Sequence, residues 1–345
     1  MTTEYVKLGV NPETDAAHIA RAAEIIRDGG LVGMPTETVY GLGASAFSAE
    51  AAGKIYAAKG RPSDNPLIVH VSEPAEAENI AYVSPLYYKL AAAFMPGPLT
   101  VIMPKKDTVP SSVTGGLDSV AVRCPSHKYA RALIRAAGVP IAAPSANRSG
   151  SPSPTTAQHV LADMDGRIEM ILDGGPCEIG LESTVIKLTD DGCIILRPGA
   201  VTEVMLARVC GTVTIARAVT DPAEAGDKPL SPGMKYKHYA PKAEVVLVEA
   251  SDNEFETYVK VHILPGEVVA VPDDILHRFV GCSTLSAGYA SDAAAQSHSL
   301  FALLRRADEI GCSRIYMKLP PASGEYLALY NRLIRASGGK IVHVT

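Results

Sequence analysis

The sequence predicts an α/β protein with two domains. At 345 residues the chain is longer than the usual size of one hydrophobic core. Residues 1–210 alternate helix-like stretches with short β-branched apolar runs, which is typical of an α/β domain. The alternation stops at residues 216–242, which are rich in Pro, Gly and charge, and then resumes. We therefore assign residues 1–212 to a first domain, 213–242 to a linker and 243–345 to a smaller α/β domain.

The first domain opens with a predicted helix from about Thr14 to Asp28, whose apolar face includes Ile19, Ala23 and Ile26. Further helices are expected near residues 48–59, 126–137 and 155–163. Short apolar runs bounded by Gly, Pro, Asp or Ser predict strands at 31–34, 67–71, 99–103, 119–123, 139–143, 183–188 and 193–196.

The second domain shows the same alternation over a shorter length. Strands are predicted at 245–250, 267–272 and 314–320, and helices at 252–261, 291–310 and 323–337. No motif with a known chemical role occurs in it, so the sequence alone gives this domain no function.

Bulk composition excludes several protein classes. The 32 Lys and Arg residues against 37 Asp and Glu residues give a formal net charge of −5, which disfavours a basic nucleic-acid or membrane module. The six cysteines are scattered without a CxxC pair, which favours reduced thiols in the cytoplasm. No signal-peptide pattern and no membrane-length apolar run occurs in the sequence, so we expect a cytoplasmic protein.

Five segments of the first domain combine polar residues with turn-forming Gly or Pro at predicted strand ends. The first, PTETVYGLG, follows the apolar run 31–34 and could form a backbone cradle for a ligand or an ordinary turn. The second, Lys59 to Asn65, places two cations in a stiffened loop that suits a polyphosphate, or forms a solvated basic turn. His70 follows on the strand face opposite Val69, where it points into a cleft or plays a structural role.

The third segment, LDSVAVR, puts Arg123 on a strand face shared with Ser119. A buried arginine needs a carboxylate partner, which is either an internal Asp or Glu or the carboxylate of a bound amino acid. The fourth, PIAAPSAN, ends a strand in small residues that let a ligand approach the backbone. The fifth pairs GLESTV with RPG, and each of these segments alone also fits a plain turn.

Taken together, the motifs PTETVYGLG, KGRPSDNPLIVH, MPGPLT, LDSVAVRCPSH, PIAAPSAN, GLESTVI and LRPG occur in this order over residues 15–200. This combination resembles the threonylcarbamoyl-AMP synthase (YrdC-like) family, and SPGMKYKHYAP with the C-terminal α/β domain resembles its long, two-domain form. The resemblance implies a twisted α/β sheet forming a concave cavity, followed by a smaller Rossmann-like α/β domain. It also implies a nucleotidyltransferase that converts L-threonine, bicarbonate or CO₂, and ATP into threonylcarbamoyl-AMP and pyrophosphate, for N6-threonylcarbamoyladenosine formation in tRNA.

The resemblance further implies which residues bind each substrate. Threonine would be held by Thr38, His70, Arg123, the backbone of Ala143, and Ser183. ATP would be held by Lys59, Arg61, Asn65, Ser119, Ser145, Asn147, Ser153, Arg197 and, from the linker, Tyr236.

The chemistry of this reaction agrees with the residue types in these motifs. N-carboxy-threonine is already an anion when it attacks the α-phosphorus of ATP, so that step needs no strong general base. Cations should dominate instead, and Lys59, Arg61 and Arg197 are the expected catalytic residues because they offset charge on the phosphates and the leaving pyrophosphate. Mg²⁺ is expected to arrive with ATP, because the sequence has no dedicated carboxylate cage for it.

Two alternatives remain at this point. An RNA-binding or ribosome-maturation factor would use the same basic cavity without catalysis, but the near-neutral charge and the lack of an aromatic stacking platform disfavour it. A carbamoyl-transfer module acting on another carbamoyl adenylate is disfavoured because no acylphosphatase-like or zinc-binding segment is attached.

The linker itself has an unusual composition. Residues 231–241 are bracketed by Pro and Gly and place two Lys, one His and two Tyr at consecutive positions, which predicts a lid over ATP rather than a passive spacer. We expect the product to pass to a tRNA threonylcarbamoyl transferase, while direct tRNA binding by this chain is left open.

Overall fold

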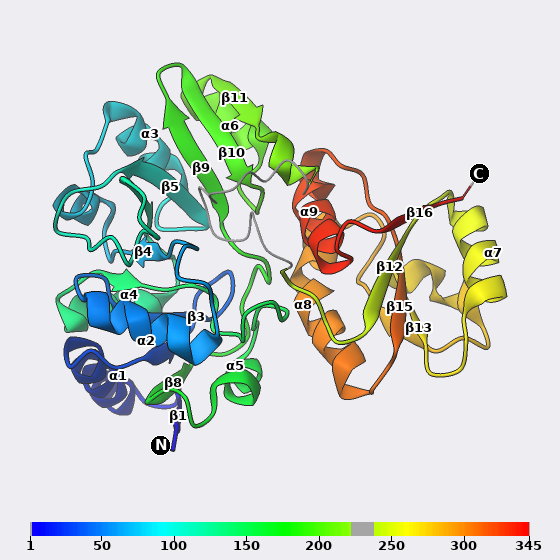
Figure 1. Ribbon diagram of the computed structural model, residues 1–345, viewed down its shortest axis with the longest axis horizontal. Coiled ribbons are helices and arrows are strands. Elements are labelled where there is room, and N and C mark those ends of the chain that lie inside the picture. The colour runs from blue at the N-terminus through cyan, green and yellow to red at the C-terminus, as the bar shows by residue number, and fades with distance from the viewer. Residues whose placement is uncertain (1, 222–237, 345) are drawn as a thin grey trace.

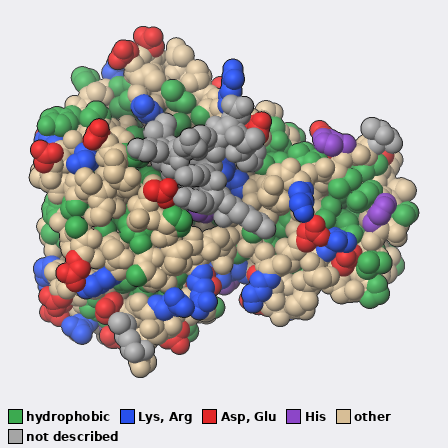
Figure 2. Space-filling view, viewed as in Figure 1, with side chains coloured by type: hydrophobic (Ala, Val, Ile, Leu, Met, Phe, Trp, Pro, Cys, Tyr) green, Lys and Arg blue, Asp and Glu red, His purple; other side chains and the backbone are tan. Residues whose placement is uncertain are grey.

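The computed structural model describes residues 2–221 and 238–344, and it confirms an α/β fold in a two-domain arrangement (Figure 1). One sheet of eleven strands belongs to the first domain, and one sheet of five strands belongs to the second. Acidic and basic side chains are intermixed over the face of both domains shown in Figure 2, in line with the net charge of −5.

The first sheet is mixed and has the order β1-β8-β2-β3-β7-β4-β6-β5-β9-β10-β11. Its strands are β1 (Glu4–Lys7), β2 (Val32–Met34), β3 (Gly41–Ser45), β4 (Ile68–His70), β5 (Leu99–Pro104), β6 (Ser119–Arg123), β7 (Ile141–Ala142), β8 (Met170–Asp173), β9 (Thr184–Thr189), β10 (Gly192–Arg197) and β11 (Thr212–Ile215). Its helices are α1 (Pro12–Arg27), α2 (Ala49–Lys59), α3 (Pro85–Phe94), α4 (Lys128–Ala137), α5 (Ala157–Met164) and α6 (Glu203–Cys210), with short 3-10 turns η1 (Pro74–Asn79) and η2 (Arg217–Val219).

The second sheet is parallel throughout and has the order β14-β13-β15-β12-β16. Its strands are β12 (Glu244–Glu249), β13 (Val268–Val271), β14 (Thr284–Ser286), β15 (Arg314–Lys318) and β16 (Ile341–His343). Its helices are α7 (Asp252–His262), α8 (Ala293–Glu309) and α9 (Leu327–Ala336), with 3-10 turns η4 (Asp273–Phe279) and η5 (Gly324–Tyr326).

The predicted helices of the first domain are confirmed as α1, α2, α4 and α5, with ends shifted by a few residues. The first of them begins at Pro12 rather than Thr14, because the Asn11 side chain accepts a hydrogen bond from the Glu13 amide at 2.8 Å and caps the helix. All three residues expected on its apolar face are buried in the core.

Several elements escaped the sequence prediction. β3 reads GLGAS, and such small residues do not predict a strand, yet a Cβ at Gly43 would lie 2.9 Å from the Ile141 side chain. This position therefore requires glycine because the neighbouring strand is so close. β11 pairs with β10, so residues 212–215 belong to the first sheet and the segment assigned to the linker from residue 213 begins too early.

The two domains meet along a polar and an apolar contact surface. Helices α8 and α9 lie on the side of the second domain that faces the first (Figure 1). Arg332 of α9 forms an ion pair with Glu182 at 2.9 Å, and Arg305 of α8 forms one with Asp163 at 2.7 Å. Val39 of the first domain packs into the same apolar cluster as residues of both helices. The second domain is thus anchored to the segments that carry the GLEST and PTET motifs.

Candidate active site

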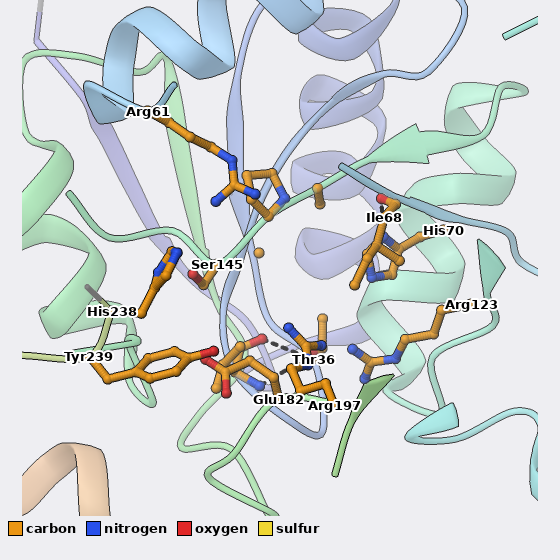
Figure 3. Close-up of a pocket in the computed structure, with 14 residues that line it drawn as sticks. Thr36, Arg61, Ile68, His70, Arg123, Ser145, Glu182, Arg197, His238 and Tyr239 are labelled. Atoms are coloured by element: carbon orange, nitrogen blue, oxygen red, sulfur yellow. Dashed lines mark hydrogen bonds between the residues drawn. The ribbon is translucent and has the colours of Figure 1, made fainter. Parts of the chain in front are cut away.

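A pocket in the first domain gathers residues from all five motif segments. It is lined by Thr36, Val39, Gly41, Arg61, Ile68, His70, Arg123, Ala143, Pro144, Ser145, Glu182, Arg197, His238 and Tyr239. Figure 3 shows His70 and Arg123 at one end of the pocket and Arg61, Ser145 and His238 at the other. The pocket therefore has two chemically distinct ends.

The first end is built by two neighbouring parallel strands. His70 ends β4 and Arg123 ends β6, and the two residues are partners in the strand register. Arg123 Nη2 lies 2.7 Å from Glu37 Oε1, and both side chains are buried. Of the two partners that the sequence left possible, the structure gives the internal carboxylate. Burial raises and the Arg123 guanidinium lowers the pKa of Glu37, and the net direction is downward, so this carboxylate stays ionised.

His70 is held as a neutral ring. Burial, followed by the positive charge of Arg123, lowers the pKa of His70 to about 3. Its Nδ1 lies 3.1 Å from the Ile68 carbonyl oxygen, which can only accept, so Nδ1 carries the proton and donates it. The other ring nitrogen is then an acceptor, which is the role that a hydroxyl or ammonium group of a ligand would need.

At the second end, Arg61 is buried and donates to neutral oxygens. Its Nε donates to the Asn65 carbonyl at 3.3 Å and its Nη2 to the Pro66 carbonyl at 3.0 Å. Burial lowers the pKa of Arg61 to about 10, so it remains charged at neutral pH. Burial, followed by the charge of Arg61, lowers the pKa of His238 to about 3, and its Nε2 has no hydrogen-bond partner among the described residues. A buried polar atom of this kind is available to a ligand.

Arg197 lies between the two ends and is positioned by the fifth motif. Its Nε donates to the Ser183 carbonyl and its Nη2 to the Ser183 hydroxyl, both at 3.1 Å. The Ser183 hydroxyl is also 2.7 Å from the Thr100 hydroxyl. Ser183 therefore orients Arg197 from within the wall of the pocket.

Glu182 is an acidic side chain of the lining, and it is held between the two domains. One carboxylate oxygen accepts from the Ser153 hydroxyl, and the other accepts from Arg332 Nε at 2.9 Å. Arg332 is fully buried, and its guanidinium lies over the Tyr239 ring at 5.6 Å from the centroid. Despite burial, the charges of Arg332 and then Arg197 keep the pKa of Glu182 below its ordinary value.

Lys59 is held by backbone carbonyls of the PSAN segment. Its Nζ donates to the carbonyl oxygens of Ser145 and Asn147, each at 2.5 Å, and Lys59 is buried. Burial, followed by the charge of Arg61, lowers the pKa of Lys59 well below its ordinary value. In this structure Lys59 ties α2 to the PSAN segment, because two strong carbonyl acceptors lie within reach of its ammonium group.

The other expected residues occupy several positions around the pocket. Ala143 and Ser145 line it, while Thr38 is fully buried with its hydroxyl 2.9 Å from that of Thr36. Asn147 accepts from the Ser145 hydroxyl at 2.5 Å. Asn65, Ser119 and Ser153 are not among the described residues that line the pocket. Asn65 is buried, Ser119 begins β6, and Ser153 donates to Glu182. Tyr236 lies outside the described residues.

Sequence reasoning missed some residues that line or support the pocket. Glu182 lies inside the GLEST motif, which also fits a plain turn when it is considered alone, and only the structure shows that this carboxylate lines the pocket. His238 and Tyr239 belong to the linker segment, whose aromatic and basic composition was the signal that could have found them. The role of Arg332 could not be predicted, because the sequence of an amphipathic helix does not indicate which distant carboxylate an arginine on it will contact.

Within residues 2–221 and 238–344, no three side chains of His, Cys, Asp or Glu come together as a metal site. Over the same residues, none of the helices has the length and apolar character needed to cross a membrane.

Comparison with known proteins assigns both domains. Residues 24–199 match a family model described as "Telomere recombination", and residues 201–338 match one described as "Threonylcarbamoyl-AMP synthase, C-terminal domain". The chain is 43% identical over 333 residues to the threonylcarbamoyl-AMP synthase of Bacillus subtilis, with 95% of each chain covered. It is 42% identical over 346 residues to the Pyrococcus abyssi threonylcarbamoyl-AMP synthase, with 98% of this chain and 99% of the relative covered.

A solved structure extends the likeness to three dimensions. The crystal structure of Pyrococcus abyssi Sua5 complexed with L-threonine aligns with the whole chain at a TM-score of 0.90 and 40% sequence identity, and all of both chains is covered.

Proposed function

Because this chain belongs to the threonylcarbamoyl-AMP synthase family, we propose that it converts L-threonine, bicarbonate or CO₂, and ATP into threonylcarbamoyl-AMP and pyrophosphate. Transfer of the AMP moiety makes it a nucleotidyltransferase. The observation that carries the proposal is the pocket with two ends, one formed by His70 and Arg123 and the other by Arg61, with Arg197 between them.

Threonine fits the end formed by β4 and β6. An arginine has five N–H donors, and Arg123 uses some of them on Glu37 and on the Gly97 carbonyl, so others are available for a carboxylate. The acceptor nitrogen of neutral His70 can take a hydrogen bond from the threonine hydroxyl or amine. The Ala143 side chain in the lining is small enough for the ligand to reach the backbone.

The triphosphate of ATP fits the Arg61 end. Arg61 and Arg197 donate to neutral oxygens, so their positive charges are available to phosphate oxygens. The unprotonated amine of threonine first adds to CO₂ and releases a proton to solvent, which gives N-carboxy-threonine. An oxygen of this new N-carboxylate then bonds to the α-phosphorus of ATP while the bond from that phosphorus to the bridging oxygen of the β-phosphate breaks, and pyrophosphate leaves with that electron pair. The two arginines stabilise the charge that develops on the phosphates.

Mg²⁺ enters this scheme as part of the ATP substrate. Mg²⁺ keeps several waters and binds nucleotide phosphates readily, so a dedicated set of protein ligands is not required. The product would serve N6-threonylcarbamoyladenosine formation through a separate tRNA threonylcarbamoyl transferase, because an acyl adenylate is a reactive carrier that still needs an acceptor.

Pyrophosphate release from ATP tests the proposal. The purified chain should release pyrophosphate only when threonine, bicarbonate and Mg-ATP are all present, and omission of any one should reduce release to background. Release that is unaffected by omitting threonine would overturn the assignment. Tight RNA binding without such turnover would favour a non-catalytic RNA-binding role instead.

A further inference from the structure

The second domain contains a cavity at the place where open parallel sheets bind ligands. From β12 the chain runs through β13 to β14 at one edge of the sheet, and it then crosses back to β15 and on to β16 at the other edge. The direction of the connections therefore reverses between β13 and β15. Ligands of doubly wound α/β domains bind at the carboxyl ends of the strands beside this reversal.

The cavity occupies this reversal point and has a volume of about 310 Å³. Val271 and Pro272 reach it from the end of β13, and Lys318 and Leu319 reach it from the end of β15. It shares no lining residue with the pocket of the first domain. Helices α8 and α9, which cover the face of the sheet toward the first domain, form its apolar wall (Figure 1).

Its size and walls select small, mostly apolar molecules. At roughly 30 Å³ for each water-sized group, the volume accepts about ten such groups, or one ring with a short chain. Most lining residues are aliphatic or aromatic, such as Phe255, Leu300 and Leu303. The charged groups are few: Asp252 and Lys318, which form an ion pair with each other, and Asp274.

These charged groups disfavour phosphates. The N-terminus of α7, which would face a phosphate in a dinucleotide-binding domain, is closed by a capping box between Ser251 and Glu254. Asp252 adds a second acidic side chain in the same turn, and the β12–α7 connection contains no glycine for a close phosphate approach. Two carboxylates against one ammonium group leave the lining with a net negative charge.

We propose that this cavity is a second ligand site, separate from the active site, that binds a small amine with an apolar body. The apolar part would pack against α8 and α9 beneath the strand ends. The ammonium group would lie near Asp252 and Asp274, where it replaces part of the attraction that Lys318 now supplies. A carboxylate of the same shape would meet two negative charges instead.

A matched pair of probes tests the site in the full chain. Phenethylamine and 3-phenylpropionate have the same ring and nearly the same length but opposite charge. Titration calorimetry or ligand-observed NMR should give a dissociation constant on the order of 1 mM or lower for the amine. The carboxylate should bind about tenfold more weakly, because attraction is exchanged for repulsion.

Three variants make the result specific to the cavity. Ala290→Trp, at the exposed rim, should abolish binding of the amine by filling the mouth. Asp252→Asn should lower the preference for the amine at least about fivefold, because it leaves Lys318 without its partner. Asp191→Asn, an exposed acidic residue of the first domain, removes the same charge far from the cavity and should change nothing.

Equal binding of both probes would overturn the proposal, as would amine binding that survives Ala290→Trp. Failure to saturate with the amine at about ten times the expected dissociation constant would overturn it as well. Pyrophosphate release is independent of this outcome, so the site can fail while the proposed function of the first domain stands.

Discussion

The two ends of the active-site pocket differ in how their positive charges are balanced. At the first end, Arg123 is paired at 2.7 Å with the buried carboxylate of Glu37. At the second end, Arg61 donates to neutral carbonyl oxygens, and Arg197, which lies between the two ends, also donates to neutral oxygens. A nearly neutral end suits a zwitterion such as an amino acid, whereas arginines that donate only to neutral oxygens suit a polyanion. The difference predicts which substrate each arginine serves.

Glu182 would weaken this contrast if it stood alone, because it lines the pocket near Arg197. Arg332 removes the problem by pairing with Glu182 from the second domain. The charge balance of the first-domain pocket thus depends on a residue that lies 150 positions away in the sequence.

The largest effect is expected from Arg332→Met, which leaves Glu182 buried without its partner. Breaking a buried pair in this way costs about 3–5 kcal/mol in the free energy of unfolding, which urea denaturation measures. ATP binding should weaken too, because the free carboxylate opposes the phosphates. Adding Glu182→Gln to the same chain should restore much of the loss. Arg306→Met, which removes an exposed arginine of α8, is the matched control and should stay within about 0.5 kcal/mol.

Arg123→Ala should raise the threonine concentration needed for half-maximal pyrophosphate release by on the order of a hundredfold. The threonine carboxylate loses its guanidinium, a charge-assisted hydrogen bond of about 1.5–3 kcal/mol, and then faces the unpaired Glu37. The ATP requirement should change little. An additional Glu37→Gln substitution should recover part of the affinity, and unchanged threonine affinity in folded Arg123→Ala would make the pair purely structural.

Arg61→Ala should weaken ATP by about tenfold and leave threonine nearly untouched, because Arg197 still offsets part of the phosphate charge. Arg61→Lys keeps the positive charge but loses the planar set of N–H donors. Its ATP affinity should therefore lie between those of the unchanged chain and Arg61→Ala. Steady-state measurements with each substrate varied separately distinguish these outcomes. Equal losses for ATP and threonine would contradict the division of the pocket into two ends.

The smallest expected change at neutral pH is in the free energy of unfolding, and it comes from the histidines at the two ends of the pocket. His70 and His238 each have a pKa of about 3 in the fold, below the ordinary value of 6.5. The unfolded chain therefore binds more protons in acid, and the free energy of unfolding falls as pH drops from about 6.5 toward 3. Each histidine contributes up to about 1.4 kcal/mol per pH unit in that window.

Thermal unfolding between pH 7 and pH 5 measures this contribution. His70→Gln and His238→Gln should each flatten the loss of stability, while His277→Gln, an exposed histidine of the second domain, should leave the slope as it is. An identical slope in all three variants would show that neither pocket histidine is kept neutral by the fold.

The sequence predicted the fold class and much of the pocket because both depend on local patterns. The family resemblance implied that His70 and Arg123 share one site, and the structure brings the two residues together at neighbouring strand ends. The contacts of Lys59 with the Ser145 and Asn147 carbonyls could not be predicted, because they depend on how two segments far apart in the sequence meet. The ion pair of Arg332 with Glu182 could not be predicted for the same reason.

The pairing of Glu182 with Arg332 also has a consequence for the order in which the protein is made. Synthesis at roughly 5–20 residues per second separates the two residues by about 8–30 s, since 150 positions lie between them. During that interval the first domain can form its sheet, because β11 ends at Ile215. Its pocket nevertheless holds an unpaired carboxylate until α9 has left the ribosome and docked. A nascent chain therefore stays poorly suited to bind ATP until nearly its whole length has been translated.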